Sequence, residues 1–187
     1  EVNGNLAFAN YFSAGIDARI AHDFNQDRKE GKISSNSVVA NKMHYVKRFF
    51  ADRNYFLQNG KLSYTEVDGK IKTLDVSGFR TVIVGNIPSF ASGANPFYCA
   101  DMSDKILEIV CAPNLLAFLG AIAIGNIPFL GHLYKKYFLH SYKATSLELE
   151  VLPSEYLQLD GEDLTGQGVE KVSIRYGYQV QMLALGG

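Results

Sequence analysis

Carboxylates gather on one turn near the end of the chain. Asp160, Glu162 and Asp163 follow the alternating segment 156–159, and Gly161 stands between the first two. A carboxylate on such a turn can accept the proton of a substrate hydroxyl as a general base, or take part in a magnesium network. Asp-Gly is also a common hairpin turn, so taken alone the pair favours a structural role.

Nucleotide-binding motifs are missing from the sequence. Its three Gly-Lys pairs have Gln26, Tyr55 and Tyr64 where the first glycine of a phosphate-binding loop would stand, and no G-x-G-x-x-G occurs. The adjacent glycines Gly186 and Gly187 stand at the end of the given chain, where they cannot begin a loop that leads into a helix. We therefore expect no ATP site formed by these residues alone.

The histidines, serines and cysteines offer no further catalytic or metal-binding pattern. The four histidines, at positions 22, 44, 132 and 140, include no i, i+4 pair, and the G-x-S-x-G serine motif is absent. Cys99 and Cys111 have no second pair and no histidine at a metal-finger spacing. We expect two reduced core thiols in a cytosolic protein.

Composition indicates one ordinary globular domain. The chain has 187 residues, of which 47% are hydrophobic and 20% charged. Lys and Arg together number 18 against 19 for Asp and Glu, so no global positive field exists to hold a phosphate backbone. Nucleic acid is therefore excluded as an expected partner.

Helical and strand patterns follow one another along the chain. An apolar strand-like segment at 5–12 leads into a bend at 13–15, where a glycine suits a close backbone approach. Apolar residues at helical spacing predict a helix over about 17–30, stopped at Gly31, and a second helix over about 38–54.

Alternating patterns dominate the rest of the sequence. A hairpin is predicted over 61–74 with a type I′ turn at Asp68-Gly69. An irregular loop is expected over 89–103 and a helix over 115–124. Such an order predicts a mainly β or α+β fold, an antiparallel β-sandwich decorated by two or three helices. Further strands are expected at 79–87, 105–111, 138–152, 156–159, 169–176 and 178–185.

A long uncharged stretch runs from Ile109 to Tyr134. It is long enough to cross a bilayer as one helix, but Pro128 would leave a backbone group without a partner in lipid, and several glycines also interrupt the segment. We expect a buried core helix here, with a lipid-facing surface helix as the alternative.

Several segments together resemble the accessory domain of eukaryotic diacylglycerol kinases. They occur in the order found in that family and cover nearly the whole chain. The first, NYFSAGIDARIAHDF, is the most specific. The matching segments are 10–24, Asn41-Lys42-Met43, Asn86-Ile87-Pro88-Ser89, Gly93-Ala94-Asn95, 103–108, Asp160-Gly161-Glu162 and 179–183.

The resemblance implies a two-domain lipid kinase with the lipid kinase and NAD kinase-like fold. Residues 1–187 would be its second, C-terminal accessory domain, and the nucleotide-binding domain, with a Gly-Gly-Asp-Gly loop, would precede them and is absent from this chain. Kinases of this family transfer the γ-phosphoryl group of ATP, with magnesium, to the primary hydroxyl of diacylglycerol, which gives phosphatidic acid. The first residue of the chain, Glu1, is not a methionine, which fits a piece of a longer protein.

Site residues follow from the same resemblance. It implies Asp160 as the general base toward the lipid hydroxyl, with Glu162 beside it, and Asp104 as a magnesium ligand, with Asp101 as a second candidate. A capping role for Asp104 beside Ser103 remains the alternative. No nucleotide-binding residue is expected in this chain, and we expect the isolated chain to be inactive.

Partners and location are implied in the same way. We expect the chain's own N-terminal catalytic domain, diacylglycerol and a peripheral contact with a membrane as partners, and a cytoplasmic location. Another lipid kinase, of the sphingosine or ceramide type, and a docking domain without catalysis remain as alternatives.

Two departures from the family pattern bear on lipid access. The loop between Asn95 and Ser103 is shorter than in animal diacylglycerol kinases, and segment 115–133 is more apolar than the family's usual helix there. Our hypothesis is that the exposed side of this segment, including Leu116 and Phe118, meets the membrane.

Overall fold

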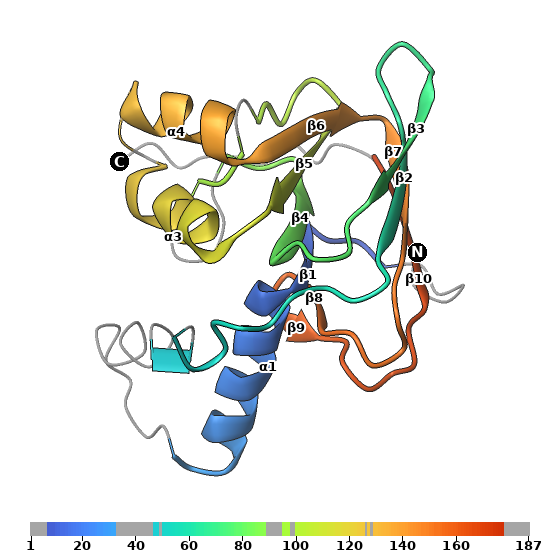
Figure 1. Ribbon diagram of the computed structural model, residues 1–187. Helices are drawn as coiled ribbons and strands as arrows, with labels where there is room; N and C mark the ends of the chain where they lie inside the picture. The colour runs from blue at the N-terminus through green and yellow to red at the C-terminus, as the bar shows by residue number, and fades with distance from the viewer. Residues whose placement is uncertain are drawn as a thin grey trace, which may run out of the picture.

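Two antiparallel sheets stacked face to face, with helices on the outer side of one of them, make up the molecule (Figure 1). In the described ranges there are ten strands and three helices, which agrees with the β-sandwich expected from the sequence. The computed structural model describes residues 7–32, 47–48, 50–88, 95–97, 100–125, 127 and 129–177.

The larger sheet has six strands in the order β6-β5-β4-β1-β8-β9, and every neighbouring pair is antiparallel. Its central strands β4 and β5 are buried along their whole length, which fits their nearly continuous apolar sequences. The strands are β1 (Tyr11–Gly15), β4 (Thr81–Gly85), β5 (Leu107–Ala112), β6 (His140–Ala144), β8 (Leu157–Leu159) and β9 (Glu162–Asp163).

The smaller sheet has four strands in the order β10-β7-β2-β3. In β2 and β7 alternate residues are buried, so one face of this sheet meets the core and the other meets solvent. The strands are β2 (Lys61–Thr65), β3 (Ile71–Asp75), β7 (Ser146–Glu150) and β10 (Lys171–Arg175).

The main hydrophobic core lies between the two sheets. Because successive side chains of a strand point to opposite faces, only every second residue of the larger sheet reaches this core. The larger sheet contributes Phe12, Ala14, Val82, Val84, Ile109 and Cys111, and the smaller sheet contributes Leu62, Tyr64, Leu147, Leu149 and Val172.

A second core joins the other face of the larger sheet to the helices α1 (Ile16–Lys29) and α3 (Leu115–Ile124). Ile83 and Val110 of the sheet pack there with residues of both helices. The third helix, α4 (Leu130–Phe138), follows α3 and leads into β6. Asn114 caps α3, since its Oδ1 accepts the Ala117 N–H at 2.9 Å.

The first strand and helix differ in detail from the prediction. Residues 13–15 lie within β1 and do not form a bend, while α1 begins at Ile16, one residue before the start predicted for this helix. Gly15 has a φ of 102°, and a Cβ there would collide with the carbonyl oxygen of Arg80. The close backbone approach expected at this glycine is therefore confirmed.

The β2–β3 hairpin forms as predicted, but its turn is of another type. The Gly69 N–H donates to the Glu66 carbonyl oxygen at 2.9 Å, and Gly69, but not Asp68, has a positive φ. A type I′ turn needs positive φ at both central residues. The structure therefore corrects this prediction to a type I turn followed by a left-handed glycine.

The segment from residue 130 to residue 152 also differs from the prediction. Residues 130–138 form α4, which the sequence reading missed, and the strand expected over 138–152 is divided into β6 and β7 at Thr145. Most of the helix expected over 38–54 and the strand over 178–185 lie outside the described residues. Within the described ranges, no helix combines the length and apolar character that crossing a bilayer requires.

Candidate active site

Asp160 stands on the two-residue turn between β8 and β9. Asp160 and Gly161 have φ values of 49° and 87°, the combination that a type I′ turn requires. The Asp160 N–H donates to the Tyr11 carbonyl oxygen at 3.1 Å, so the turn continues the pairing of β8 with β1. The turn therefore places an exposed carboxylate at one end of the larger sheet.

The Asp160 carboxylate is held by the start of β1. The Asn10 N–H lies 3.0 Å from each of its oxygens, and the Tyr11 N–H donates to Oδ1 at 2.9 Å. Asn10 Nδ2 adds a bond of 3.2 Å to Oδ2. Such bonds fix the orientation of the carboxylate while leaving lone pairs for a further donor.

Tyr11 lies beside this turn. Burial, together with the negative charges of Asp17 and Asp160, raises the pKa of Tyr11 to about 12. The phenol therefore stays protonated at neutral pH. Its oxygen would be 3.8 Å from a Cβ added at Gly161, which puts a hydroxyl next to the candidate base.

A buried polar cluster supports the same strands from the helical side. Ser13 on β1 and Gln158 on β8 are directly opposite each other, and Asp17 lies in the first turn of α1. The Ser13 hydroxyl donates to Asp17 Oδ2 at 2.8 Å, and Gln158 Nε2 donates to the Ser13 oxygen at 2.7 Å and to Asp17 Oδ2. The cluster ties β1, β8 and α1 together behind the turn.

The other carboxylates of the turn differ in their surroundings. Glu162 is exposed on β9, opposite Leu159. Asp163 is partly buried and lies 2.6 Å from Nδ1 of His22 on α1. Burial would raise the pKa of Asp163, but the hydrogen bonds from Thr165 and His22 outweigh it and lower the pKa. Asp163 thus joins the hairpin to α1.

Asp101 and Asp104 lie together in the loop that leads into β5. Asp101 Oδ1 accepts the Ser103 N–H at 2.8 Å and the Ser103 hydroxyl at 2.6 Å, and these bonds lower the pKa of Asp101. Asp104 Oδ1 accepts the Ile106 N–H at 2.9 Å. Both carboxylates therefore have the turn-capping role that was kept as an alternative for Asp104.

A row of residues across the sheet shows how far Asp160 lies from the start of β5. Tyr11, next to Asp160, is opposite Gly85, and Gly85 is opposite Glu108. Three strand spacings separate Asp160 from Glu108, which is about 14 Å. The structure thus brings Asp160 and Glu162 together on one hairpin, and Asp101 and Asp104 together in another loop at the same end of the sheet.

The fit of a magnesium ion to the second loop is partial. Within the ranges that the structure describes, no three His, Cys, Asp or Glu residues form a cluster that could hold a metal. The buried Glu108 is paired with Lys143, whose Nζ lies 3.1 Å from Oε1. Magnesium is often held by one or two protein carboxylates together with phosphate oxygens and waters. Asp101 and Asp104 could supply these carboxylates, and phosphates and waters would have to supply the other ligands.

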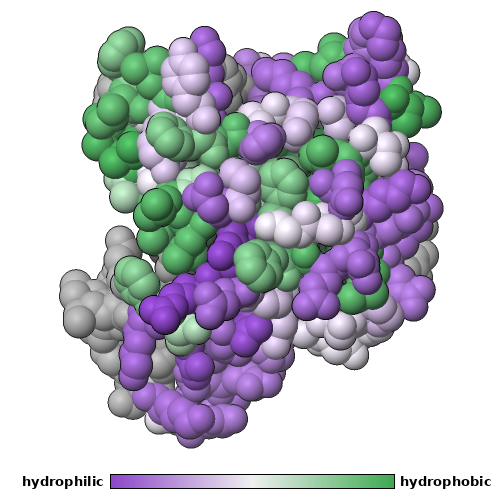
Figure 2. Space-filling view, in the orientation of Figure 1, coloured by the Kyte–Doolittle hydropathy of each residue, from purple (hydrophilic) through white to green (hydrophobic). Residues whose placement is uncertain are grey.

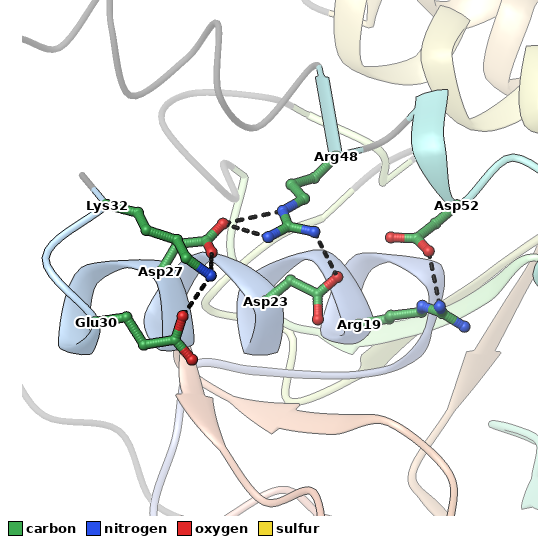
Figure 3. Close-up of polar contacts among 7 residues, drawn as sticks. All are labelled: Arg19, Asp23, Asp27, Glu30, Lys32, Arg48 and Asp52. Carbon is green, nitrogen blue, oxygen red and sulfur yellow. Dashed lines mark hydrogen bonds and ion pairs between the residues drawn. The ribbon is translucent and has the colours of Figure 1, made fainter.

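Ion pairs beside α1 form a separate polar surface (Figure 3). Arg48 contacts the buried Asp27 through Nε and Nη2 at 3.0 and 2.5 Å. Arg19 pairs with Asp52 at 2.8 Å and lines an open cavity of about 320 Å³. None of the predicted site residues lines this cavity.

Comparison with known proteins identifies the family. The model of the diacylglycerol kinase accessory domain matches residues 7–163, so the chain belongs to that family. Human diacylglycerol kinase kappa is 30% identical over 93% of this chain and 14% of its own length. Human diacylglycerol kinase iota is 26% identical over 78% of this chain and 15% of its own length.

Solved structures agree in fold. A diacylglycerol kinase from Bacillus anthracis str. Sterne matches with a TM-score of 0.55 and 20% identity, over 94% of this chain and 52% of that protein. This likeness confirms the fold class expected from the sequence. The chain spans about half the length of that bacterial protein and a much smaller part of the human kinases.

Sequence reasoning did not assign roles to the residues that hold Asp160. Asn10 and Tyr11 stand within the first family segment, which was the available signal, but neither carries a charge that would suggest a site. Gln158 lies two residues before Asp160 on an alternating strand, and only the register of β1 against β8 puts it beside Ser13.

Proposed function

We propose that this chain is the acceptor-side domain of a lipid kinase that phosphorylates diacylglycerol with ATP and yields phosphatidic acid. Membership of the accessory-domain family and the absence of a nucleotide motif support a role on the lipid side of the reaction, with ATP bound by another domain. The chain supplies the proton acceptor for the lipid, and a nucleotide-binding domain outside this chain holds ATP.

Asp160 is the general base in this proposal. The observation that carries it is the fixed, exposed carboxylate of Asp160, which three N–H donors of Asn10 and Tyr11 orient. The primary hydroxyl of diacylglycerol would donate its proton to Asp160 as its oxygen attacks the γ-phosphorus, while the bond to the β-phosphate oxygen of ADP breaks. Glu162, on the same hairpin, adds negative charge that favours the protonated base.

Magnesium would bind at this site together with the phosphates of ATP. Asp104, with Asp101 beside it, is the proposed protein ligand, and the ionised carboxylates would hold the ion together with waters and phosphate oxygens from outside this chain. When bound, the ion neutralises charge on the transferred phosphoryl group.

A phosphorylation assay on the whole natural protein that contains this chain tests the proposal. Incubated with ATP, magnesium and diacylglycerol in detergent micelles, it should form phosphatidic acid, whereas residues 1–187 alone should form none above background. Sphingosine and ceramide serve as competing acceptors in the same assay. Preferential phosphorylation of either, or no lipid phosphorylation by the whole protein, would overturn the proposal.

A further inference from the structure

Exposed hydrophobic side chains gather on the two helices at one end of the molecule. Figure 2 shows hydrophobic residues over the region that Figure 1 labels α3 and α4. Leu116 is 76% exposed and Phe129 is 78% exposed, far more than large apolar residues usually are. The α3–α4 patch is formed by Leu116, Ile127, Phe129, Leu130, Tyr137 and Phe138.

The two helices form one connected surface. The Tyr134 hydroxyl donates to the Leu116 carbonyl oxygen at 2.6 Å, which links α4 to the start of α3. The Tyr134 ring also stacks on Phe138, with 4.6 Å between the centroids. A Cβ at Gly120 would overlap the Tyr134 ring, so the small residue allows the helices to approach. A ligand of this patch therefore meets both helices at once.

The charged residues within the sequence stretch that forms this patch are all basic. No Asp or Glu occurs between Glu108 and Glu148, whereas Lys135, Lys136 and Lys143 fall within that stretch. Lys135 is buried and donates to the Phe97 carbonyl oxygen at 2.7 Å, but Lys136 is exposed, with its Nζ 5.5 Å from the Tyr137 ring centroid. An apolar face bordered by lysine and aromatic residues matches the apolar interior and anionic headgroups of a membrane surface.

Phe129 adds a conformational argument. It precedes α4 with φ 64° and ψ −55°, a strained combination for a bulky residue. Strain of this kind is unfavourable, and the Phe129 ring, 78% exposed, gains little burial against the described residues to offset it. A partner outside the chain that accepts the ring would account for its position.

We propose that the α3–α4 patch inserts into the headgroup region of a membrane that contains anionic lipids. This inference rests on the proposed function, because a lipid acceptor must be taken from such a surface. Leu116 belongs to the contact, as the apolar sequence suggested. Phe118, expected with it, is only 1% exposed and packs in the second core, which corrects that part of the hypothesis.

Vesicle sedimentation of residues 1–187 tests the patch directly. With vesicles of phosphatidylcholine and phosphatidylserine, the variant carrying Leu116→Glu and Phe129→Glu should lose about tenfold or more of the vesicle affinity, because two apolar side chains no longer enter the bilayer. Ile71→Glu is the matched control, since Ile71 is 75% exposed but lies on β3 in the other sheet. Circular dichroism checks that each variant is folded.

Charge is tested separately. Lys136→Glu should weaken binding to phosphatidylserine vesicles by about fivefold, corresponding to roughly 1 kcal/mol per cation near the surface, and should have less effect with phosphatidylcholine alone. Lys61→Glu, on the exposed side of β2, should change neither. Added salt should reduce the effect of Lys136→Glu.

The outcomes separate this inference from the proposed function. In the whole protein, the Leu116→Glu, Phe129→Glu variant should phosphorylate diacylglycerol in vesicles poorly and short-chain diacylglycerol in solution normally. Unchanged vesicle binding by this variant, or no binding by the wild-type chain, would overturn the inference even if the kinase is active. If the wild-type chain does not bind vesicles but forms a dimer in sedimentation velocity, and the variant is a monomer, the patch is a contact with a second copy and the inference is overturned.

Discussion

Glu155 is a buried carboxylate that precedes β8, at the opposite end of this strand from Asp160. It accepts the Tyr156 N–H at 2.9 Å and the Gln58 N–H at 3.4 Å. Burial raises its pKa above the ordinary value of 4.5, and these two hydrogen bonds oppose the rise without cancelling it. The folded state therefore binds a proton more tightly than the unfolded state does.

The sign of the resulting pH dependence follows from linkage. Stability contributed by protonated Glu155 is fully present below the ordinary pKa and is lost as the pH rises through the raised pKa. The Glu155→Gln variant lacks this loss. The free energy of unfolding of the variant should therefore increase relative to that of wild type as the pH rises from about 4.5. Urea titrations across that range measure the difference.

The exposed Glu170 provides the control for this prediction. Glu170→Gln should leave the pH dependence of the unfolding free energy close to that of wild type. If Glu155→Gln follows the same pH profile as wild type, burial does not govern the titration of this group.

At the scale of elements, Arg48 fastens the segment that contains it to α1. Its guanidinium contacts Asp27, which is buried, and Asp23, at 3.7 Å (Figure 3). Arg48→Met should therefore reduce the free energy of unfolding by about 2 kcal/mol, since Asp27 loses two charge-assisted hydrogen bonds. Lys32 remains near Asp27 and limits the loss.

Lys29→Met is the control for this ion pair, because Lys29 is exposed in the last turn of α1. It should change stability by less than about 0.5 kcal/mol. Equal effects of the two substitutions in urea unfolding would show that the Arg48 contacts do not hold the two elements together.

Gly15 governs the junction of β1 and α1. Replacement by alanine combines a positive φ with a collision against the Arg80 carbonyl oxygen, so Gly15→Ala should cost about 3 kcal/mol or more. Gly31→Ala is the matched control, because Gly31 also has a positive φ but has open space around it. It should cost about 1 kcal/mol. Similar thermal melting shifts for the two variants would contradict the collision.

At the scale of the whole molecule, local patterns predicted the elements better than their contacts. Helix α1 and the β2–β3 hairpin follow from the spacing of apolar residues near Ile16 and Leu62. Helix α4 was missed although apolar and aromatic residues recur at helical spacing within 130–138, because the helix is only nine residues long and Phe129 before it provides no side-chain cap. The structure shows that it packs on α3 through tertiary contacts.

The candidate site was predictable only as a set of residue types. The family resemblance pointed to Asp160, but the donors that hold it come from Asn10 and Tyr11, 150 and 149 residues away in the chain. Such pairing depends on which strands lie side by side and in which register, and apolar periodicity carries neither. The roughly 14 Å between Asp160 and Glu108 followed only from the sheet order.

The central claim is that Asp160 accepts the proton of the lipid hydroxyl, and turnover of Asp160→Asn tests it most directly. The amide keeps the left-handed turn and can still accept an N–H of Tyr11, but it is not a base. In the whole protein, with diacylglycerol in micelles, kcat should fall by about 10² to 10⁴ with little change in melting temperature.

Asp68→Asn is the matched control, because Asp68 also precedes a left-handed glycine in an exposed hairpin turn, on the other sheet. It should leave kcat unchanged. The account is contradicted if Asp160→Asn turns over diacylglycerol at nearly the wild-type rate.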